Sequence, residues 1–283
     1  MLINISSDLL SVGINPFGAE LNSVKDKNGL EYLWQADPKY WKRHAPILFP
    51  FIGPLEDGEY THNKKTYKMT SHGFARDNHF ALDELGEDFA SFILTGEETK
   101  DIYPFDFSLK VKYMVSGNKV NTSATVKNTG NEKMYFYLGG HPAFNCPLVP
   151  DESFDDYIVE FEKPEFIEQP LEDGSKRTIL DNKTEVALSH KLFEHDVFMK
   201  SNGNSSCVSL KSKKSGKGVK IDFTGCDCIA VWSPASDAQF VCLEPWSSVP
   251  SINDKSKELC EKKLAICLAP HEEYDFSFTA TMF

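Results

Sequence analysis

LKVKYMVSGNKVNTSATV, residues 109–126, contains two runs of alternating apolar and polar residues on either side of Gly117-Asn118. The apolar positions are Leu109, Val111, Tyr113, Val115, Val120, Ala124 and Val126. Successive side chains of a strand point to opposite faces, so this period of two is typical of strands with one buried face. Glycine next to asparagine supplies the backbone conformations of a tight turn. The stretch therefore predicts an antiparallel hairpin.

The rest of the chain repeats this pattern. Apolar residues alternate again from Tyr274 to Met282, and Asp26-Lys27-Asn28-Gly29 is one of several turn signals between apolar runs. Helical patterns are scarce and are confined to short stretches at 188–198 and 255–262. No strand–helix alternation or glycine-rich nucleotide fingerprint is present. We therefore expect an all-β chain that forms one domain, residues 1–283, as a large antiparallel sandwich or barrel with few short helices.

Charge and cysteine content limit the classes of partner. The 283 residues carry 30 basic and 42 acidic side chains, a formal net charge of −12, and no basic cluster that would favour nucleic acid. The longest apolar stretch, residues 45–55, is too short for a membrane span and contains three prolines. Seven cysteines form no evident disulfide or metal framework. We expect a cytoplasmic protein with no nucleic-acid or membrane partner; the oligomeric state is open.

Two segments in the first third of the chain look unlike ordinary strands. WKRHAPILFPFIGPLEDG (41–58) joins basic residues to a proline-interrupted apolar run, which predicts extended chain at a sheet edge. SHGFARD (71–77) gathers a histidine, an arginine and an aspartate around one glycine, through which backbone can approach a ligand closely. A buried connector and a surface turn are the respective alternatives.

Two later segments carry residues suited to proton transfer. In GGHPAFN (139–145), His141 follows an aromatic run and two glycines, so it is expected at a strand end, where an imidazole can exchange protons near neutral pH. In FVCLEPWSS (240–248), Glu244 stands inside an apolar strand, where burial would raise its proton affinity. A structural histidine and a glutamate on an exposed edge are the alternatives.

Five stretches, four of them from the segments above, taken in order resemble the aldose 1-epimerase (galactose mutarotase-like) family, in particular its short, single-domain bacterial members. They are APILFPFIG, HGFARD, GGHPAFN, LSHKLFEHDVFM and VCLEPW, and the resemblance extends from Phe17-Gly18-Ala19-Glu20 to the final strands. It implies a β-supersandwich with an open cleft for one monosaccharide. It also implies interconversion of α and β anomers without a metal or other cofactor.

The resemblance also implies roles for individual residues. His141 matches the catalytic histidine of the family and Glu244 its catalytic glutamate. His72 matches a second histidine of the sugar cleft, and Asp196 matches the substrate-binding aspartate within a looser motif. We expect Trp246 or Phe144 to lie against the apolar face of the sugar.

One position departs from the family pattern. Many members have an arginine directly after the Phe-Pro-x-x-Gly run, where this chain has Pro54. The related hexose-6-phosphate mutarotases tend to have Gly-Pro there and a basic residue from upstream, a role open to Arg43 here, with Arg76 as a second basic residue. Mutarotation of a free hexose is therefore the first expectation and of a 6-phosphorylated hexose the second. A non-catalytic carbohydrate-binding module on the same scaffold is an alternative of another class.

Overall fold

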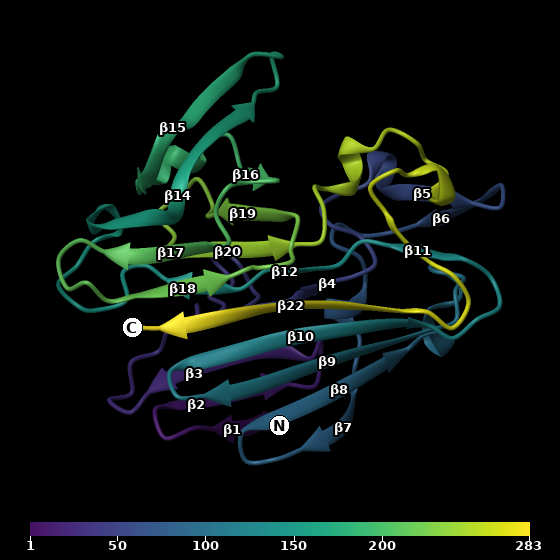
Figure 1. Cartoon of the computed structure of the whole chain (residues 1–283), viewed down its shortest axis with the longest axis horizontal. Coiled ribbons are helices and arrows are strands. Elements are labelled where there is room, and N and C mark those ends of the chain that lie inside the picture. The colour runs from purple at the N-terminus through teal and green to yellow at the C-terminus, as the bar shows by residue number, and fades with distance from the viewer.

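The computed structural model describes all residues, 1–283, and its main layer is an antiparallel sheet of nine strands (Figure 1). In spatial order these are β15 (Lys176–Ala187), β14 (Tyr157–Pro170), β17 (Cys207–Ser212), β18 (Gly218–Asp222), β22 (Glu273–Met282), β10 (Lys119–Asn128), β9 (Phe107–Ser116), β8 (Phe89–Thr95) and β7 (Ala81–Leu85). The all-β prediction is confirmed.

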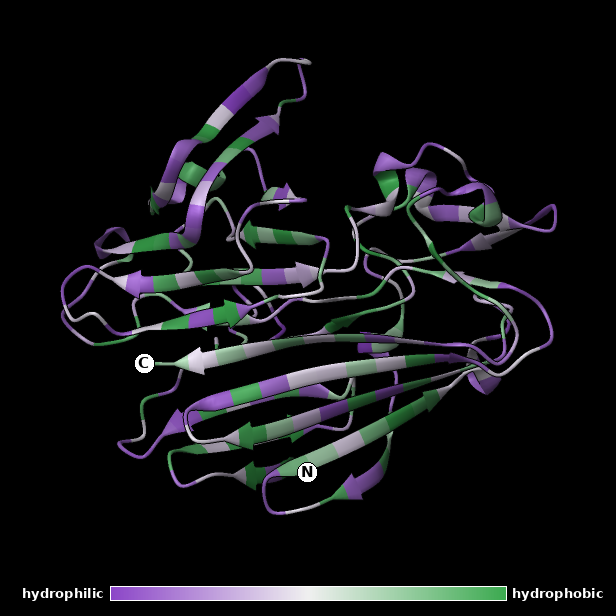
Figure 2. Cartoon of the chain, in the orientation of Figure 1, coloured by the Kyte–Doolittle hydropathy of each residue, from purple (hydrophilic) through white to green (hydrophobic).

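The predicted hairpin lies in the interior of this sheet, between β22 and β8. β9 and β10 pair along their whole length, from Phe107 opposite Asn128 to Ser116 opposite Lys119. Gly117 and Asn118 therefore form the turn between them. Buried and partly exposed residues alternate along both strands, as the sequence pattern requires. Figure 2 shows the same alternation of hydrophobic and hydrophilic bands.

A second sheet of six strands packs against the first. Its order is β16 (Phe198–Ser201), β19 (Cys228–Trp232), β20 (Phe240–Trp246), β12 (Gly139–Gly140) and β4 (Ile47–Leu48), with β13 (Ala143–Asn145) also paired to β20. Side chains from both sheets form one cluster of 70 buried hydrophobic residues. β4 is an edge strand, which confirms the expectation for the proline-interrupted segment.

Smaller elements surround these sheets. The strands are β1 (Ile3–Ser6), β2 (Leu10–Asn15), β3 (Glu20–Asp26), β5 (Glu59–His62), β6 (Lys65–Lys68), β11 (Met134–Phe136) and β21 (Ile266–Leu268). The 3₁₀ helices are η1 (Glu56–Gly58), η2 (Ala75–Asp77), η3 (Gly96–Thr99), η4 (Phe154–Asp156), η5 (His190–Phe193), η6 (Ser251–Asn253) and η7 (Leu259–Glu261). The two stretches with helical patterns hold single turns only. No helix has the length and apolarity needed to cross a membrane.

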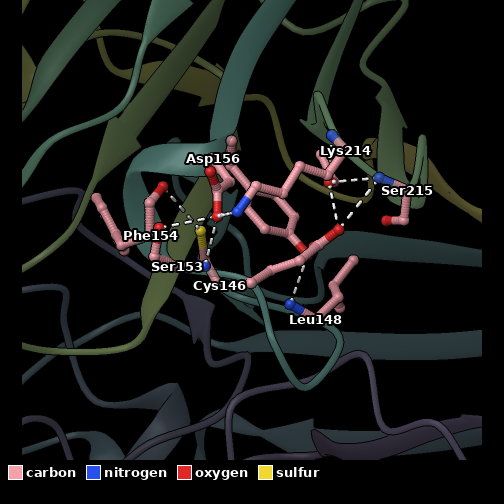
Figure 3. Close-up of polar contacts among 10 residues, drawn as sticks. Cys146, Leu148, Ser153, Phe154, Asp156, Lys214 and Ser215 are labelled. Atoms are coloured by element: carbon pink, nitrogen blue, oxygen red, sulfur yellow. Dashed lines mark hydrogen bonds and ion pairs between the residues drawn. The ribbon is translucent and has the colours of Figure 1, made fainter.

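β14 and β15 extend well beyond the body of the nine-stranded sheet (Figure 1). β14 pairs with β17 only from Tyr157 to Phe161, and from Glu165 to Pro170 it pairs with β15 alone. We call this projecting hairpin, residues 162–184, the arm. A polar network fixes the start of β14 (Figure 3). There Asp156 accepts hydrogen bonds from Ser153 and pairs with Lys214 at 2.7 Å, and the Tyr157 hydroxyl accepts one from the Leu148 backbone N–H.

Candidate active site

A cleft of ≈ 330 Å³ lies on the face of the six-stranded sheet that points away from the inter-sheet core. That volume falls in the range of small-molecule sites. Six of the eight predicted site residues line the cleft: His72, Arg76, His141, Asp196, Glu244 and Trp246. Segments that resemble the family motifs and are distant in sequence therefore meet at one concave site.

Glu244 is placed by the alternation along β20. Val241 and Leu243 point into the inter-sheet core, whereas Phe240 and Cys242 belong to a separate cluster on the opposite face. Glu244 is two residues beyond Cys242 and therefore points to the same face as Cys242. Its side chain is only 1% exposed, which excludes an exposed edge position. Burial raises its pKa well above the usual carboxyl range, although the neighbouring Trp246 indole opposes this rise.

His141 follows β12 directly, as the sequence predicted. Its backbone N–H donates to the Pro46 carbonyl at 3.0 Å, and its Nε2 lies 3.3 Å from Oε2 of Glu244. Trp41 stacks on the imidazole with ring centroids 4.8 Å apart and planes at 25°. Burial lowers the pKa of His141 well below its usual value. The two proposed catalytic groups are therefore in contact, desolvated and shifted in opposite directions.

Several buried polar atoms in the cleft have no hydrogen-bond partner. They are His141 Nδ1, Glu244 Oε2, Trp246 Nε1 and Arg76 Nε. Unsatisfied polar atoms are costly in a protein interior, and those that persist call for an explanation such as a ligand or water. The indole and guanidinium N–H donors, the carboxyl oxygen and the imidazole nitrogen, which lie beside tryptophan rings, suit a ligand with many hydroxyls and an apolar face.

His72 presents a neutral imidazole to the cleft. Burial, with the nearby arginines, lowers its pKa to about 3. The Gly53 backbone N–H donates to its Nδ1 at 3.1 Å, so in the neutral ring the proton is on Nε2. The residue has a φ of 66°, in the left-handed region. His72 is therefore a hydrogen-bond donor to a ligand oxygen and not a cation.

Two amide substitutions separate the roles of the two ring nitrogens. His72→Asn keeps an acceptor near Nδ1 and tolerates the left-handed backbone, but it removes the donor at Nε2. His72→Gln can extend an amide N–H toward the Nε2 position. We expect kcat/KM to fall roughly tenfold or more in His72→Asn and less in His72→Gln. Equal values for both variants, measured by polarimetry, would show that the Nε2 donor is not used.

The two candidate arginines differ in their surroundings. Arg76 lines the cleft, and its Nη2 donates to the Ser71 carbonyl at 2.5 Å. Arg43 does not line the cleft. Its Nη2 lies 2.7 Å from Oδ1 of Asp77 and its Nη1 donates to the Arg76 carbonyl at 3.2 Å. The predicted sugar contact of Arg43 is therefore corrected: its guanidinium braces the segment that carries Arg76.

Asp196 is held at the rim by a tryptophan that the sequence analysis did not select. Its Oδ1 accepts a hydrogen bond from Trp232 Nε1 at 2.7 Å, and its φ is 67°. Aspartate adopts this left-handed conformation more readily than most residues. Its second carboxylate oxygen is available for a ligand hydroxyl.

Phe144 does not belong to the cleft. It is 1% exposed and lines a small apolar cavity between the sheets, together with Leu21 and Phe278. On β13 its neighbour Ala143 faces the cleft side, and alternation turns Phe144 to the core. Its proposed place against the sugar is therefore wrong. Trp41 and Trp232 line the cleft instead, beside Trp246.

One set of side chains near the cleft has metal-ligating atoms close together. His141, Cys242 and Glu244 place their ligand atoms within 4.8 Å of one another. Cys242 does not line the cleft, and burial raises the pKa of its thiol well above the usual value, which disfavours the thiolate that a metal needs. The prediction of a metal-free site stays a prediction.

A family model described as aldose 1-epimerase matches residues 1–277. The chain belongs to the aldose 1-epimerase family. Protein LacX of Lactococcus lactis subsp. lactis, the chromosomal form, is 36% identical over all of this chain and 99% of its own length. This confirms the resemblance that the sequence motifs carried.

Solved structures of the same family have the same fold. A galactose mutarotase related enzyme from Lactobacillus acidophilus has a TM-score of 0.93 at 32% identity, covering 100% of this chain and 97% of that one. A galactose mutarotase-like protein from Lactobacillus casei has a TM-score of 0.91 at 29% identity, with both chains fully covered. The predicted galactose mutarotase-like sandwich is confirmed.

Proposed function

We propose that this aldose 1-epimerase family member interconverts the α and β anomers of an unphosphorylated hexose by general acid–base catalysis. The observation that supports this most is the contact between His141 and Glu244 at the base of a cleft with unpartnered polar atoms. The anomeric and ring oxygens of a pyranose are both bonded to C1. A base for one and an acid for the other must therefore be close neighbours, as these two groups are.

The reaction requires only proton transfer and bond rotation. Glu244 removes the proton of the anomeric hydroxyl while His141 protonates the ring oxygen, and the C1–O5 bond breaks. The aldehyde then rotates about C1–C2. Reclosure on the other face reverses both transfers, so the groups exchange roles and end in their starting protonation states. Since no electrons or groups leave the sugar, the two side chains suffice.

The pKa values of the two groups are shifted in opposite directions, which favours a pair that carries one proton. Burial lowers the pKa of His141 and raises that of Glu244, so both shifts favour the uncharged pair with its proton on Glu244, whose Oε2 lies 3.3 Å from His141 Nε2; catalysis uses the tautomer with that proton on His141. When the proton is on His141, the stacked Trp41 ring stabilises the imidazolium by a cation–π interaction. The pair can then donate one proton and accept another in a single step.

The charges of the cleft favour a neutral sugar. Arg76 is the arginine that lines it, His72 is neutral, and the carboxyl groups of Asp196 and Glu244 line the same cleft. Arg43, which could have completed a phosphate site, is paired with Asp77. The Nε of Arg76, which makes no hydrogen bond and lies 3.9 Å from Oδ2 of Asp77, is the observation in favour of a 6-phosphorylated hexose, which we retain as the second candidate.

Polarimetry distinguishes these functions. We expect this protein to accelerate the decay of optical rotation of freshly dissolved α-glucose or α-galactose. A coupled assay should give a higher kcat/KM for the free hexose than for its 6-phosphate. A preference for the phosphorylated sugar that Arg76→Leu abolishes would instead establish the second candidate. Sugar binding without acceleration would identify a carbohydrate-binding module.

A further inference from the structure

The inward face of the arm carries two polar residues where an amphipathic strand would normally have apolar ones. Glu165, Ile167 and Gln169 are buried on this face, while Phe166 and Glu168 point outward. Glu165 accepts hydrogen bonds from the backbone N–H groups of Asn204 and Ser205, each at 2.7 Å. Glu165 thus anchors the segment that follows β16, and Gln169 lies two residues beyond Ile167 on the same face.

Gln169 makes the corresponding anchor on the other side of β16. The residue is 4% exposed, and its Nε2 lies within hydrogen-bond distance of three successive carbonyl oxygens. They are those of His195 at 2.7 Å, Asp196 at 3.3 Å and Val197 at 2.9 Å. One side-chain amide therefore fixes the backbone on both sides of Asp196.

A second contact fixes the amide itself. Arg177, across the hairpin on β15, donates from Nη2 to Oε1 of Gln169 at 2.6 Å and to the Leu192 carbonyl at 2.6 Å. Oε1 is thereby occupied as an acceptor, which orients the amide nitrogen toward the three carbonyls. A glutamate of the same size would instead direct a carboxylate oxygen at those carbonyls and be repelled.

We propose that Gln169 is a positioning residue that sets affinity for the sugar by holding Asp196 in its left-handed conformation at the cleft rim. The inference rests on the proposed function, since it assigns Asp196 to substrate binding. In this view the arm is a support for one wall of the cleft. Gln169 acts through Asp196 and touches no reacting atom, so its loss should weaken binding equally in ground and transition states and change KM more than kcat.

The test uses Gln169→Leu and Gln169→Glu in the full chain, with Glu168→Gln on the outward face as the matched control. We expect KM for the hexose to rise about tenfold in both Gln169 variants, with kcat within about twofold of wild type. The control should keep the wild-type KM. In the background of Asp196→Ala, Gln169→Leu should not raise KM further, because Gln169 affects binding only through the Asp196 side chain.

A readout independent of activity separates this proposal from the proposed function. The Trp232 indole N–H is bonded to Asp196, so its resonance in a ¹⁵N-correlated spectrum reports where that carboxylate lies. We expect this resonance to move in both Gln169 variants and to stay in the control. An unmoved resonance with an unchanged KM, or a KM that rises equally with and without the Asp196 side chain, would overturn the positioning role. A wild type without mutarotation would refute the proposed function while the resonance still tested the anchor.

Discussion

Glu244→Gln and His141→Asn are each expected to lower kcat/KM for mutarotation by about 10²–10⁴-fold, the usual contribution of general acid–base catalysis. Glu244→Gln preserves side-chain volume, and His141→Asn keeps a polar amide but loses the ring stacked on Trp41, so circular dichroism should stay close to wild type in both and the urea midpoint should fall more in His141→Asn. Because the two groups act as a unit, the double variant should be little worse than the poorer single variant. Polarimetry on a fresh α-anomer measures the effect.

The control is Cys242→Ala on the same strand face, which does not line the cleft and should keep near-normal turnover.

The pH dependence of mutarotation is a further check on the pair. Activity requires one proton on the pair: it should fall below the lowered pKa of His141, where both groups are protonated, and above the raised pKa of Glu244, where neither is. The acid limb is therefore expected below pH 6.5. Near-normal turnover in either catalytic variant would contradict its assigned role.

Gly73→Ala is expected to cost roughly 4 kcal/mol of unfolding free energy, near the upper end for single substitutions. Gly73 has a φ of 73°, and an added Cβ would lie 2.2 Å from the Phe49 carbonyl oxygen. That oxygen cannot yield easily, because it accepts the backbone N–H groups of Phe74 and Ala75 at 3.0 and 3.2 Å. Any shift also displaces the adjacent His72, so kcat/KM should fall by up to about 10²-fold.

Gly174→Ala is the matched control for backbone strain alone. Gly174 has a φ of 83° in the turn of the arm, and a Cβ there would meet nothing within 4 Å. It should lose only about 1–2 kcal/mol, the cost of the left-handed conformation. Urea unfolding of both variants measures the difference. Equal losses would mean that the strand segment around Phe49 relaxes and that the close approach is not specific.

The period-two patterns predicted strands well and their arrangement poorly. Residues 109–126 form the expected hairpin because both alternation and turn are local properties. The pairing of β10 with β22 joins Asn121 to Thr279 across a long sequence separation. No local pattern encodes such a neighbour. The arm was also missed, since its buried Glu165 and Gln169 interrupt the alternation that marks a strand.

The site was predicted where a residue is unusual for its surroundings. A carboxylate in an apolar run and a histidine after two glycines are visible in sequence, and Glu244 and His141 were found. The predicted sugar contacts of Phe144 and Arg43 were wrong. The face to which a short-strand residue points and the partner of a guanidinium both depend on tertiary contacts, which the sequence pattern does not encode. Trp41 and Trp232 gave no signal, since aromatic residues near strands usually signify core packing.

The proposed base, Glu244, lies on β20, a strand covered on both sides, whereas Asp196, His72 and Arg76 come from connecting segments. Exchange of buried strand residues is constrained by packing, but connecting segments accept substitution more freely. Under the proposed function, substitutions in the connecting segments would therefore alter which carbohydrate is recognised without disturbing the groups proposed to open its ring. Preference for a new hexose should be obtainable by redesigning those three positions and their supports while the central strand is left intact.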